Sequence, residues 1–248
     1  MKETKTLWQN VAENAVYVIV FFAIIAAMFV IAFALEKLSR KKNPDSKSEK
    51  FFTTRKMAVV GILSAMATVL MIFDFPLPFI PSFYKLDFSE LPVLIGSFAF
   101  GPATGVVMEF IKIILKLLIK GTSTAFIGEL ANFVVGCSFI IPAATIYMFK
   151  KTKQRAIISC ATGVVILAGF AAVFNVLYLL PAFTKFMSMD AILKSGAEKN
   201  SLVNENSLAS FVTFAIVPLN LIKGISISVV TMLIYKPLSR FMKSNNNY

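Results

Sequence analysis

The sequence predicts an all-α integral membrane protein of about seven helices, and three observations support this fold class. First, the 248 residues are 57% hydrophobic, with a mean hydropathy of +0.77, and only 15% are charged, whereas a soluble domain carries about 25% charged residues. Second, several apolar runs approach the roughly 20 residues that a helix needs to cross a bilayer. Third, the Lys and Arg residues that give a net charge of +12 cluster between these runs.

The apolar runs predict the helices in chain order. The first run, 15–35, contains no charged residue and is too long for a signal peptide, so we expect a retained transmembrane helix. A second helix is expected at 57–73, followed by a proline-rich stretch at 74–81 that cannot be regular helix. The remaining apolar segments are expected at 91–100, 103–119, 125–149, 156–180 and 208–235.

The distribution of Lys and Arg predicts the orientation, because cytoplasmic loops are enriched in these residues. They cluster in the linker 36–56, near 150–155 and in the C-terminal tail. Seven helices would place these three regions on one side of the membrane. We therefore expect a multi-pass membrane protein with its N-terminus outside and its C-terminus in the cytoplasm. No nucleic-acid partner is needed to explain the positive charge.

Residue types that usually carry catalysis are scarce. The chain has no His, and its two Cys lie inside apolar runs, which weakens acid–base and metal-site hypotheses. No GxxxxGK[ST] phosphate loop, HExxH or GxSxG motif occurs. We expect no catalytic residues, no metal site and no cofactor. Active transport would then draw its energy from another subunit or from an ion gradient.

Polar side chains inside the predicted helices are candidates for a ligand site, because such groups are costly in lipid and usually face a cavity or a partner helix. Three pairs have a spacing of three residues, which places each pair on one helix face: Asn220 with Lys223, Asn175 with Tyr178, and Glu129 with Asn132. Interhelical hydrogen bonding would explain any one pair. Three pairs in the outward halves of successive helices favour a shared cavity.

Charged residues also occur on the helix expected at 103–119. Glu109, Lys112 and Lys116 share one of its faces, and we interpret them as a self-paired set that packs helices or contacts a partner protein. In the preceding loop, Ser89 is expected to cap the segment 91–100, with Glu90 in the first turn.

The stretch FDFPLPFIPSFYKLDFSELP at 73–92, followed by LIGSFAFGP at 94–102, resembles the riboflavin-specific S component of energy-coupling factor (ECF) vitamin transporters. The Asn220-x-x-Lys223 pair resembles that family too. The similarity covers about residues 55–240, and its KLDFSE-LP and GxFxFGP stretches are quite specific among membrane proteins. The helix at 15–35 departs from the usual six-helix plan.

The resemblance implies a six-helix S-component bundle plus one extra N-terminal transmembrane helix. It divides the chain into 1–55, the extra helix and basic linker; 56–240, the substrate-binding membrane domain; and 241–248, a cytoplasmic tail. It also implies high-affinity riboflavin uptake, with riboflavin as transported ligand and flavin mononucleotide (FMN) as a further candidate. The implied partners are a transmembrane coupling protein and two cytoplasmic ATPase subunits.

The resemblance also assigns residues to these roles. The small residues Ala58, Gly61 and Ala65 are expected to contact the coupling protein. The expected substrate-binding residues are Tyr84, Lys85, Leu86, Asp87, Asn132, Asn175, Tyr178, Asn220 and Lys223. Two alternatives stay open: an S component for another vitamin (thiamine, biotin or pantothenate), or a stand-alone ion-coupled secondary transporter with a proton relay through Glu109, Lys112 or Glu129.

Overall fold

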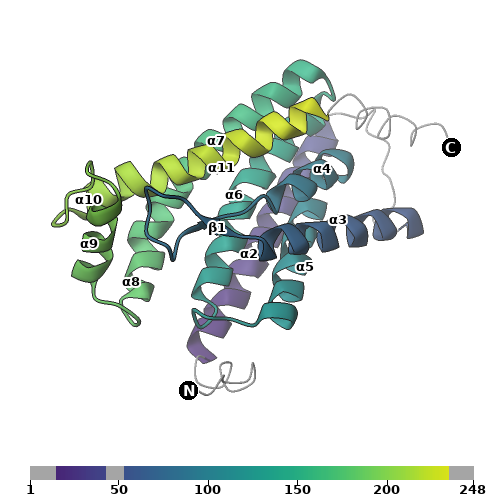
Figure 1. Cartoon of the computed structure of the whole chain (residues 1–248). Helices are drawn as coiled ribbons and strands as arrows, with labels where there is room; N and C mark the ends of the chain where they lie inside the picture. Colours follow the sequence, from purple (N-terminus) through teal and green to yellow (C-terminus); the bar gives the residue numbers. More distant parts are fainter. Residues whose placement is uncertain (1–14, 43–52, 235–248) are drawn as a thin grey trace.

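The computed structural model describes residues 15–42 and 53–234, which form a helical bundle (Figure 1). The main helices are α2 (Ala15–Lys42), α3 (Thr54–Ile72), α4 (Glu90–Phe100), α5 (Pro102–Lys120), α6 (Ile127–Phe149), α7 (Lys153–Phe174) and α11 (Val217–Leu233). Three short helices lie between α7 and α11: α8 (Leu180–Phe183), α9 (Met189–Lys199) and α10 (Leu208–Phe211). The predicted all-α membrane class is confirmed.

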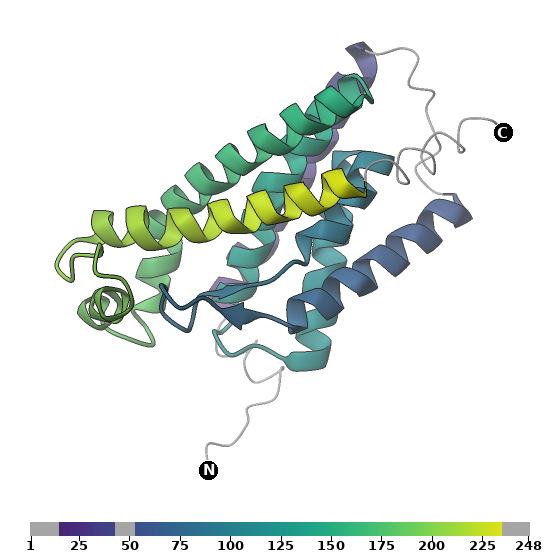
Figure 2. The same cartoon turned by 45° about the horizontal axis from the view of Figure 1, so that its top comes forward.

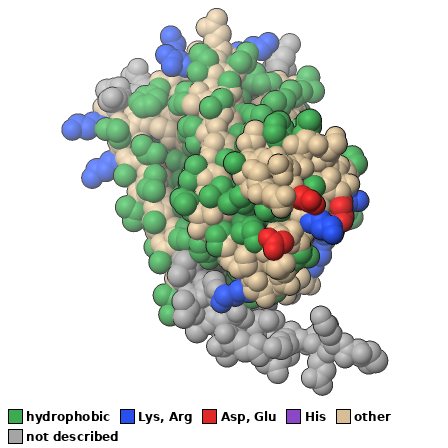
Figure 3. Space-filling view, turned by 90° about the vertical axis from the view of Figure 1, so that its left-hand side faces the viewer, with side chains coloured by type: hydrophobic (Ala, Val, Ile, Leu, Met, Phe, Trp, Pro, Cys, Tyr) green, Lys and Arg blue, Asp and Glu red, His purple; other side chains and the backbone are tan. Residues whose placement is uncertain are grey.

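Five helices of the described residues are long and apolar enough to cross a membrane: Phe22–Lys41, Thr54–Ile72, Ile127–Phe149, Lys153–Phe183 and Leu208–Leu233. The two other predicted segments do not meet that description. α4 has only 11 residues, and α5 is interrupted by charged side chains. Figure 3 shows hydrophobic side chains over much of the visible face, with charged side chains in a few places.

α6 is the central helix of the bundle. It contacts α7, α5, α2 and α4, and 78% of its apolar window is buried, compared with 22% for α2. α11 lies alongside α7, whereas α3 packs against α4 and α5 at the edge (Figures 1 and 2). The C-terminal end of α2, the beginnings of α3 and α7 and the end of α11 lie at one end of the bundle, where Arg40, Lys56 and Arg155 are also found.

The first helix is an integral part of this packing. α2 lies against α5 and α6, and Ile25 and Ala32 on that face are buried. The buried Glu36 pairs with Arg40 at 2.7 Å, and its Oε2 accepts a hydrogen bond from the backbone N–H of Ala103 at 3.0 Å. Because the first N–H groups of a helix lack partners within the helix, Glu36 caps the beginning of α5.

Two of the predicted helices contain a wider turn. The segment expected at 156–180 is α-helical to Phe174 and then forms a π-helical turn at Asn175–Leu179. The last segment contains a second such turn at Val212–Ile216, between α10 and α11. A proline follows each turn, Pro181 and Pro218, and proline cannot donate the backbone hydrogen bond of a regular helix. The expected end of the last helix, at 235, lies outside the described residues.

Candidate functional site

A short hairpin carries the loop that precedes α4. Strand β1 (Phe75–Pro76) pairs antiparallel with β2 (Lys85–Leu86), so that Phe75 lies opposite Leu86. Leu86 packs into an apolar cluster with Ile80, Ile192 and other residues of the short helices. This anchor holds the loop against the bundle and turns Tyr84 and Asp87 toward the space between α6, α7 and α11.

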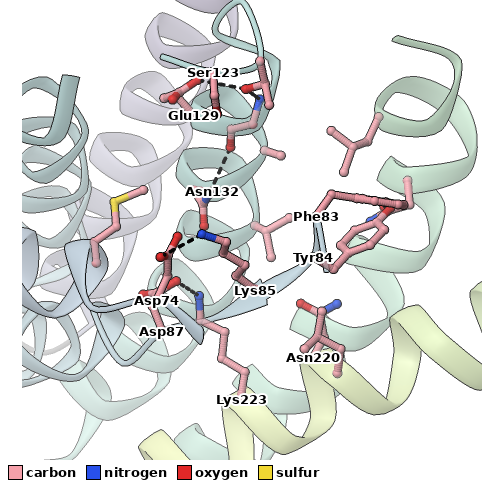
Figure 4. A pocket seen from close by; sticks show the side chains of 18 of the residues that line it. Asp74, Phe83, Tyr84, Lys85, Asp87, Ser123, Glu129, Asn132, Asn220 and Lys223 are labelled. Atoms are coloured by element: carbon pink, nitrogen blue, oxygen red, sulfur yellow. Dashed lines mark hydrogen bonds and ion pairs between the residues drawn. The ribbon is translucent and has the colours of Figure 1, made fainter. Parts of the chain in front are cut away.

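A cavity of about 210 Å³ lies between the hairpin, the end of α3, α5, α6, the π-helical turn that follows α7, α8 and α11 (Figure 4). Its apolar lining includes Met71, Phe83, Val135, Leu179, Phe183 and Leu219. Its polar lining is Asp74, Tyr84, Lys85, Asp87, Lys116, Ser123, Thr124, Glu129, Asn132, Asn175, Asn220 and Lys223. Small-molecule sites combine an apolar lining with placed polar groups, and in this cavity the polar lining residues outnumber the apolar ones.

The cavity brings together most of the residues expected to bind substrate. Those that line it are Tyr84, Lys85, Asp87, Asn132, Asn175, Asn220 and Lys223. Leu86 and Tyr178 are not among the lining residues. Leu86 is buried in the apolar cluster described above, and the Tyr178 ring stacks on Phe174 with a centroid distance of 5.2 Å.

Three asparagines present their side chains to the cavity in a similar way. The amide nitrogens of Asn132, Asn175 and Asn220 each donate to a backbone carbonyl one turn earlier in their own helix, at 3.0, 2.7 and 2.9 Å. Because the partner is a carbonyl, the amide nitrogen must face it, and the amide oxygen points away from the helix as an acceptor. The oxygens of Asn132 and Asn220 are therefore offered to a ligand that donates hydrogen bonds, whereas the oxygen of Asn175 also accepts from the Tyr84 hydroxyl.

Tyr84 joins the hairpin to the π-helical turn of α7. Its hydroxyl donates to Asn175 Oδ1 at 2.5 Å, and its ring lies 6.2 Å from that of Phe211. Burial raises the pKa of Tyr84 well above its ordinary value, so the hydroxyl keeps its proton and remains a donor. This bond closes one side of the cavity.

Lys223 lies between two carboxylates. Its Nζ is 3.1 Å from Asp87 Oδ2 and 2.9 Å from Glu90 Oε2, and all three side chains are buried. Burial alone would raise the pKa of Asp87, but the ammonium groups of Lys223 and Lys112 hold it below its ordinary value. Asp87 is therefore an anion, and the positive charge of Lys223 is already compensated.

The exposed side of the cavity has a second set of charges; Lys85 and Glu129 were expected near the site, whereas Asp74, Lys116 and Lys120 were not assigned to it. Lys116 pairs with Glu129 of α6, while Lys85 and Lys120 lie 3.1 and 3.5 Å from Asp74. The interpretation of Lys116 as part of a self-paired set on α5 is therefore wrong, because its partner is on α6.

Ser89 occupies the N-cap position of α4, but its side chain does not cap the helix as expected. Its Oγ accepts from Lys112 Nζ at 3.0 Å, and its backbone N–H donates to Asp87 Oδ1 at 2.9 Å. The ammonium of Lys112 is buried beside it and competes successfully for the hydroxyl oxygen. Ser89 thus links the cavity loop to α5.

Comparisons with known proteins agree on one family. Residues 55–235 match the family model described as "ECF transporter, substrate-specific component". The chain is 31% identical over 194 residues to "Riboflavin transporter FmnP" of Bacillus subtilis, covering 78% of this chain and 96% of that protein. It is also 31% identical over 189 residues to "Riboflavin transporter RibU" of Staphylococcus aureus, covering 76% and 93%.

A solved structure is similar over the same part of the chain. Its title is "Structure and mechanism of the S component of a bacterial ECF transporter", and the match has a TM-score of 0.60 and 30% sequence identity. It covers 76% of this chain and 98% of that one. The family model spans most of the described bundle, including every helix that lines the cavity. On this evidence the chain belongs to the family of substrate-specific components of ECF transporters.

Proposed function

We propose that the protein binds riboflavin and supports its uptake as the S component of an ECF-type, ATP-driven vitamin transporter. The observation that carries this proposal is the cavity in which oxygens of Asn132, Asn175 and Asn220 and the ammonium of Lys223 lie around an aromatic and aliphatic lining. The relatives that are named riboflavin transporters support the choice of ligand. The family is a transporter component, so the protein is not an enzyme.

The chemistry of riboflavin fits these groups. Its flat tricyclic ring can lie between aromatic and aliphatic side chains such as Phe183 and Leu179. Its ring N–H and the hydroxyls of its tail are donors, and the asparagine oxygens are acceptors. Its ring carbonyls need donors, which Lys223 can supply. The asparagine oxygens and the ammonium of Lys223 then each have a counterpart on an uncharged ligand.

The charge of the cavity distinguishes riboflavin from two of the alternatives. Biotin and pantothenate are anions and require uncompensated positive charge. Lys223 cannot supply it because Asp87 and Glu90 flank the ammonium. Thiamine is a cation, which these carboxylates would tolerate, so it is the alternative that a test must include. A thermal-shift panel of the four vitamins separates these hypotheses.

The absorbance spectrum of protein purified in detergent tests the proposal directly. We expect bound or added riboflavin to show a flavin spectrum and to lose its fluorescence on binding. Protein that stays colourless and leaves riboflavin fluorescence unquenched would contradict the proposal. FMN belongs in the same titration, since Lys85 and Lys120 are half-exposed beside Asp74 at the cavity's open side. Equal affinity for FMN would show that this side accommodates a phosphate.

Asn175→Ala is expected to weaken riboflavin binding by about 1–3 kcal/mol, because a buried acceptor and its orientation are lost. Fluorescence titration of the purified variant measures this effect. Asn206→Ala is the matched control, since Asn206 is exposed and does not line the cavity. Wild-type affinity in Asn175→Ala would show that the ligand does not use this amide.

We place the contact with the coupling protein on α3. Ala58, Gly61 and Ala65 are exposed on this helix at the edge of the bundle, and small residues permit close approach of a partner helix. The partners proposed are a transmembrane coupling protein and two cytoplasmic ATPases. Vitamin uptake by cells that lack the ATPases would instead favour the stand-alone secondary transporter.

Gly61→Leu tests this surface. Gly61 is exposed and a Cβ added there meets no atom within 4 Å, so the fold and riboflavin binding should be unchanged while uptake into cells falls several-fold. Gly169→Leu on α7 is the matched control, because Gly169 is also exposed and a Cβ there also meets no atom within 4 Å. Normal uptake with Gly61→Leu would exclude this face as the coupling contact.

The proposed orientation places the cavity on the outside and the C-terminus in the cytoplasm, with the N-terminus outside. The basic ends of α2, α3 and α7 at the opposite end from the hairpin support it. The division into 1–55, 56–240 and 241–248 stays a prediction; the boundary at 55/56 falls in the first turn of α3, and the boundary at 240/241 lies outside the described residues.

A further inference from the structure

Lys223 is the cavity end of a longer chain of buried charges. Beyond Lys223 and Glu90, the Nζ of Lys112 lies 3.3 Å from Glu90 Oε1 and 2.6 Å from Glu109 Oε2. Carboxylates and ammonium groups therefore alternate from the cavity into the bundle, in the order Asp87, Lys223, Glu90, Lys112, Glu109. We call these five residues the charge chain.

The charge chain joins four parts of the fold. Asp87 lies in the hairpin loop, Glu90 begins α4, Glu109 and Lys112 belong to α5, and Lys223 belongs to α11. All five side chains are buried, and of the five only Asp87 and Lys223 line the cavity. The carboxylate of Glu109 fits against α6 because residue 136 is glycine: a Cβ there would lie 2.9 Å from Glu109 Oε2.

We propose that Glu90 is a positioning residue for the ligand, acting through Lys223, and this inference rests on the proposed riboflavin function. Lys223 has a long flexible side chain, and a lysine ammonium has no fixed direction of its own. Glu90 and Asp87 hold the Nζ between them at 2.9 and 3.1 Å. The position of Glu90 is set in turn by Lys112, which Glu109 holds from the other side.

This arrangement separates two functions of the same ammonium group. Its contact with Glu90 fixes where it lies, and its remaining hydrogen-bond capacity can face the cavity, since an ammonium has three donors. Without the carboxylate of Glu90, Lys223 would turn toward Asp87 alone, and the donor would move relative to a bound ligand. Removing the carboxylate of Glu90 should therefore weaken ligand binding only when Lys223 is present.

A double-mutant cycle on the full chain tests the proposal, with riboflavin affinity measured by fluorescence titration. Glu90→Gln keeps the shape of the side chain and removes its charge, and we expect roughly 10- to 100-fold weaker binding. In a Lys223→Met background the same change should alter affinity by less than about threefold, because residues that act through one another are not additive. Equal effects of Glu90→Gln in both backgrounds would overturn the proposal.

A second arm keeps the test decisive if Lys223→Met binds too weakly to measure. Glu90→Asp restores the charge, and we expect it to bind riboflavin more tightly than Glu90→Gln does; equal or weaker binding overturns the proposal. Glu36→Gln is the structural control: it also alters a buried, ion-paired carboxylate, but one at the beginning of α5 that does not line the cavity. It should lower the thermal midpoint and leave the affinity unchanged.

The outcomes separate this inference from the function on which it rests. Wild-type protein that binds riboflavin while Glu90→Gln retains full affinity contradicts the positioning role alone. Wild-type protein that fails to bind riboflavin contradicts both.

Discussion

Lys112→Met is expected to destabilise the ligand-free protein by about 3–5 kcal/mol, because removing one partner of a buried ion pair leaves an uncompensated charge. Lys112 is fully buried and lies within 3.3 Å of two carboxylates, Glu90 and Glu109, as well as bonding Ser89. Methionine fills much of the same volume but compensates neither acid. The thermal unfolding midpoint in detergent, without riboflavin, measures the effect.

Lys120→Met is the control on the same helix. Lys120 is 45% exposed, and its partner Asp74 lies 3.5 Å away; a pair of this kind contributes about 0–1 kcal/mol. The two variants remove the same formal charge from α5, but the lysine that is replaced is buried in one and exposed in the other. Similar midpoints for both would mean that the charge chain does not hold the bundle together.

Lys223→Met is expected to weaken riboflavin binding by about 2–5 kcal/mol, the range for truncating one partner of a buried, hydrogen-bonded charge pair at a binding surface. Two losses combine in this variant. The cavity loses the ammonium that can donate to the ligand, and Asp87 and Glu90 lose the cation between them. Fluorescence titration with riboflavin at constant salt measures the change.

Lys199→Met is the control for this prediction, since it removes a lysine from the exposed face of α9 without touching the cavity. Its affinity should equal that of the wild type. If Lys223→Met also bound with wild-type affinity, the ligand would have to occupy a different part of the molecule.

The parts of this fold that were predictable from sequence are those that depend on local hydrophobicity. The helices α2, α3 and α6 follow from long apolar runs, and Asn175, Asn220 and Lys223 were recognisable because polar groups are costly in lipid. Which way each amide points was not predictable. It depends on the carbonyl one turn earlier in the same helix, to which each amide nitrogen donates.

The two π-helical turns and the charged side of the cavity were missed for a related reason. A π-helical turn adds one residue to a helix without changing its apolar character, so hydropathy does not reveal it. Glu129 reaches Lys116 because the chain turns sharply before α6, where Ala125 and Phe126 have φ values of 47° and 69°. Neither is a residue type that favours positive φ, so the sequence offered no signal for this turn.

The spacing of the buried charges along the chain has a consequence for how the protein is assembled in the membrane. Glu109 and Lys112 are three residues apart, and Glu90 precedes Lys112 by 22 residues, so these three can pair as soon as α4 and α5 have left the ribosome. These three residues together carry one negative charge in excess, and Asp87 adds a second. Lys223 follows Asp87 by 136 residues, so it is the last member of the charge chain to be synthesised, and its arrival with α11 reduces the excess to a single negative charge.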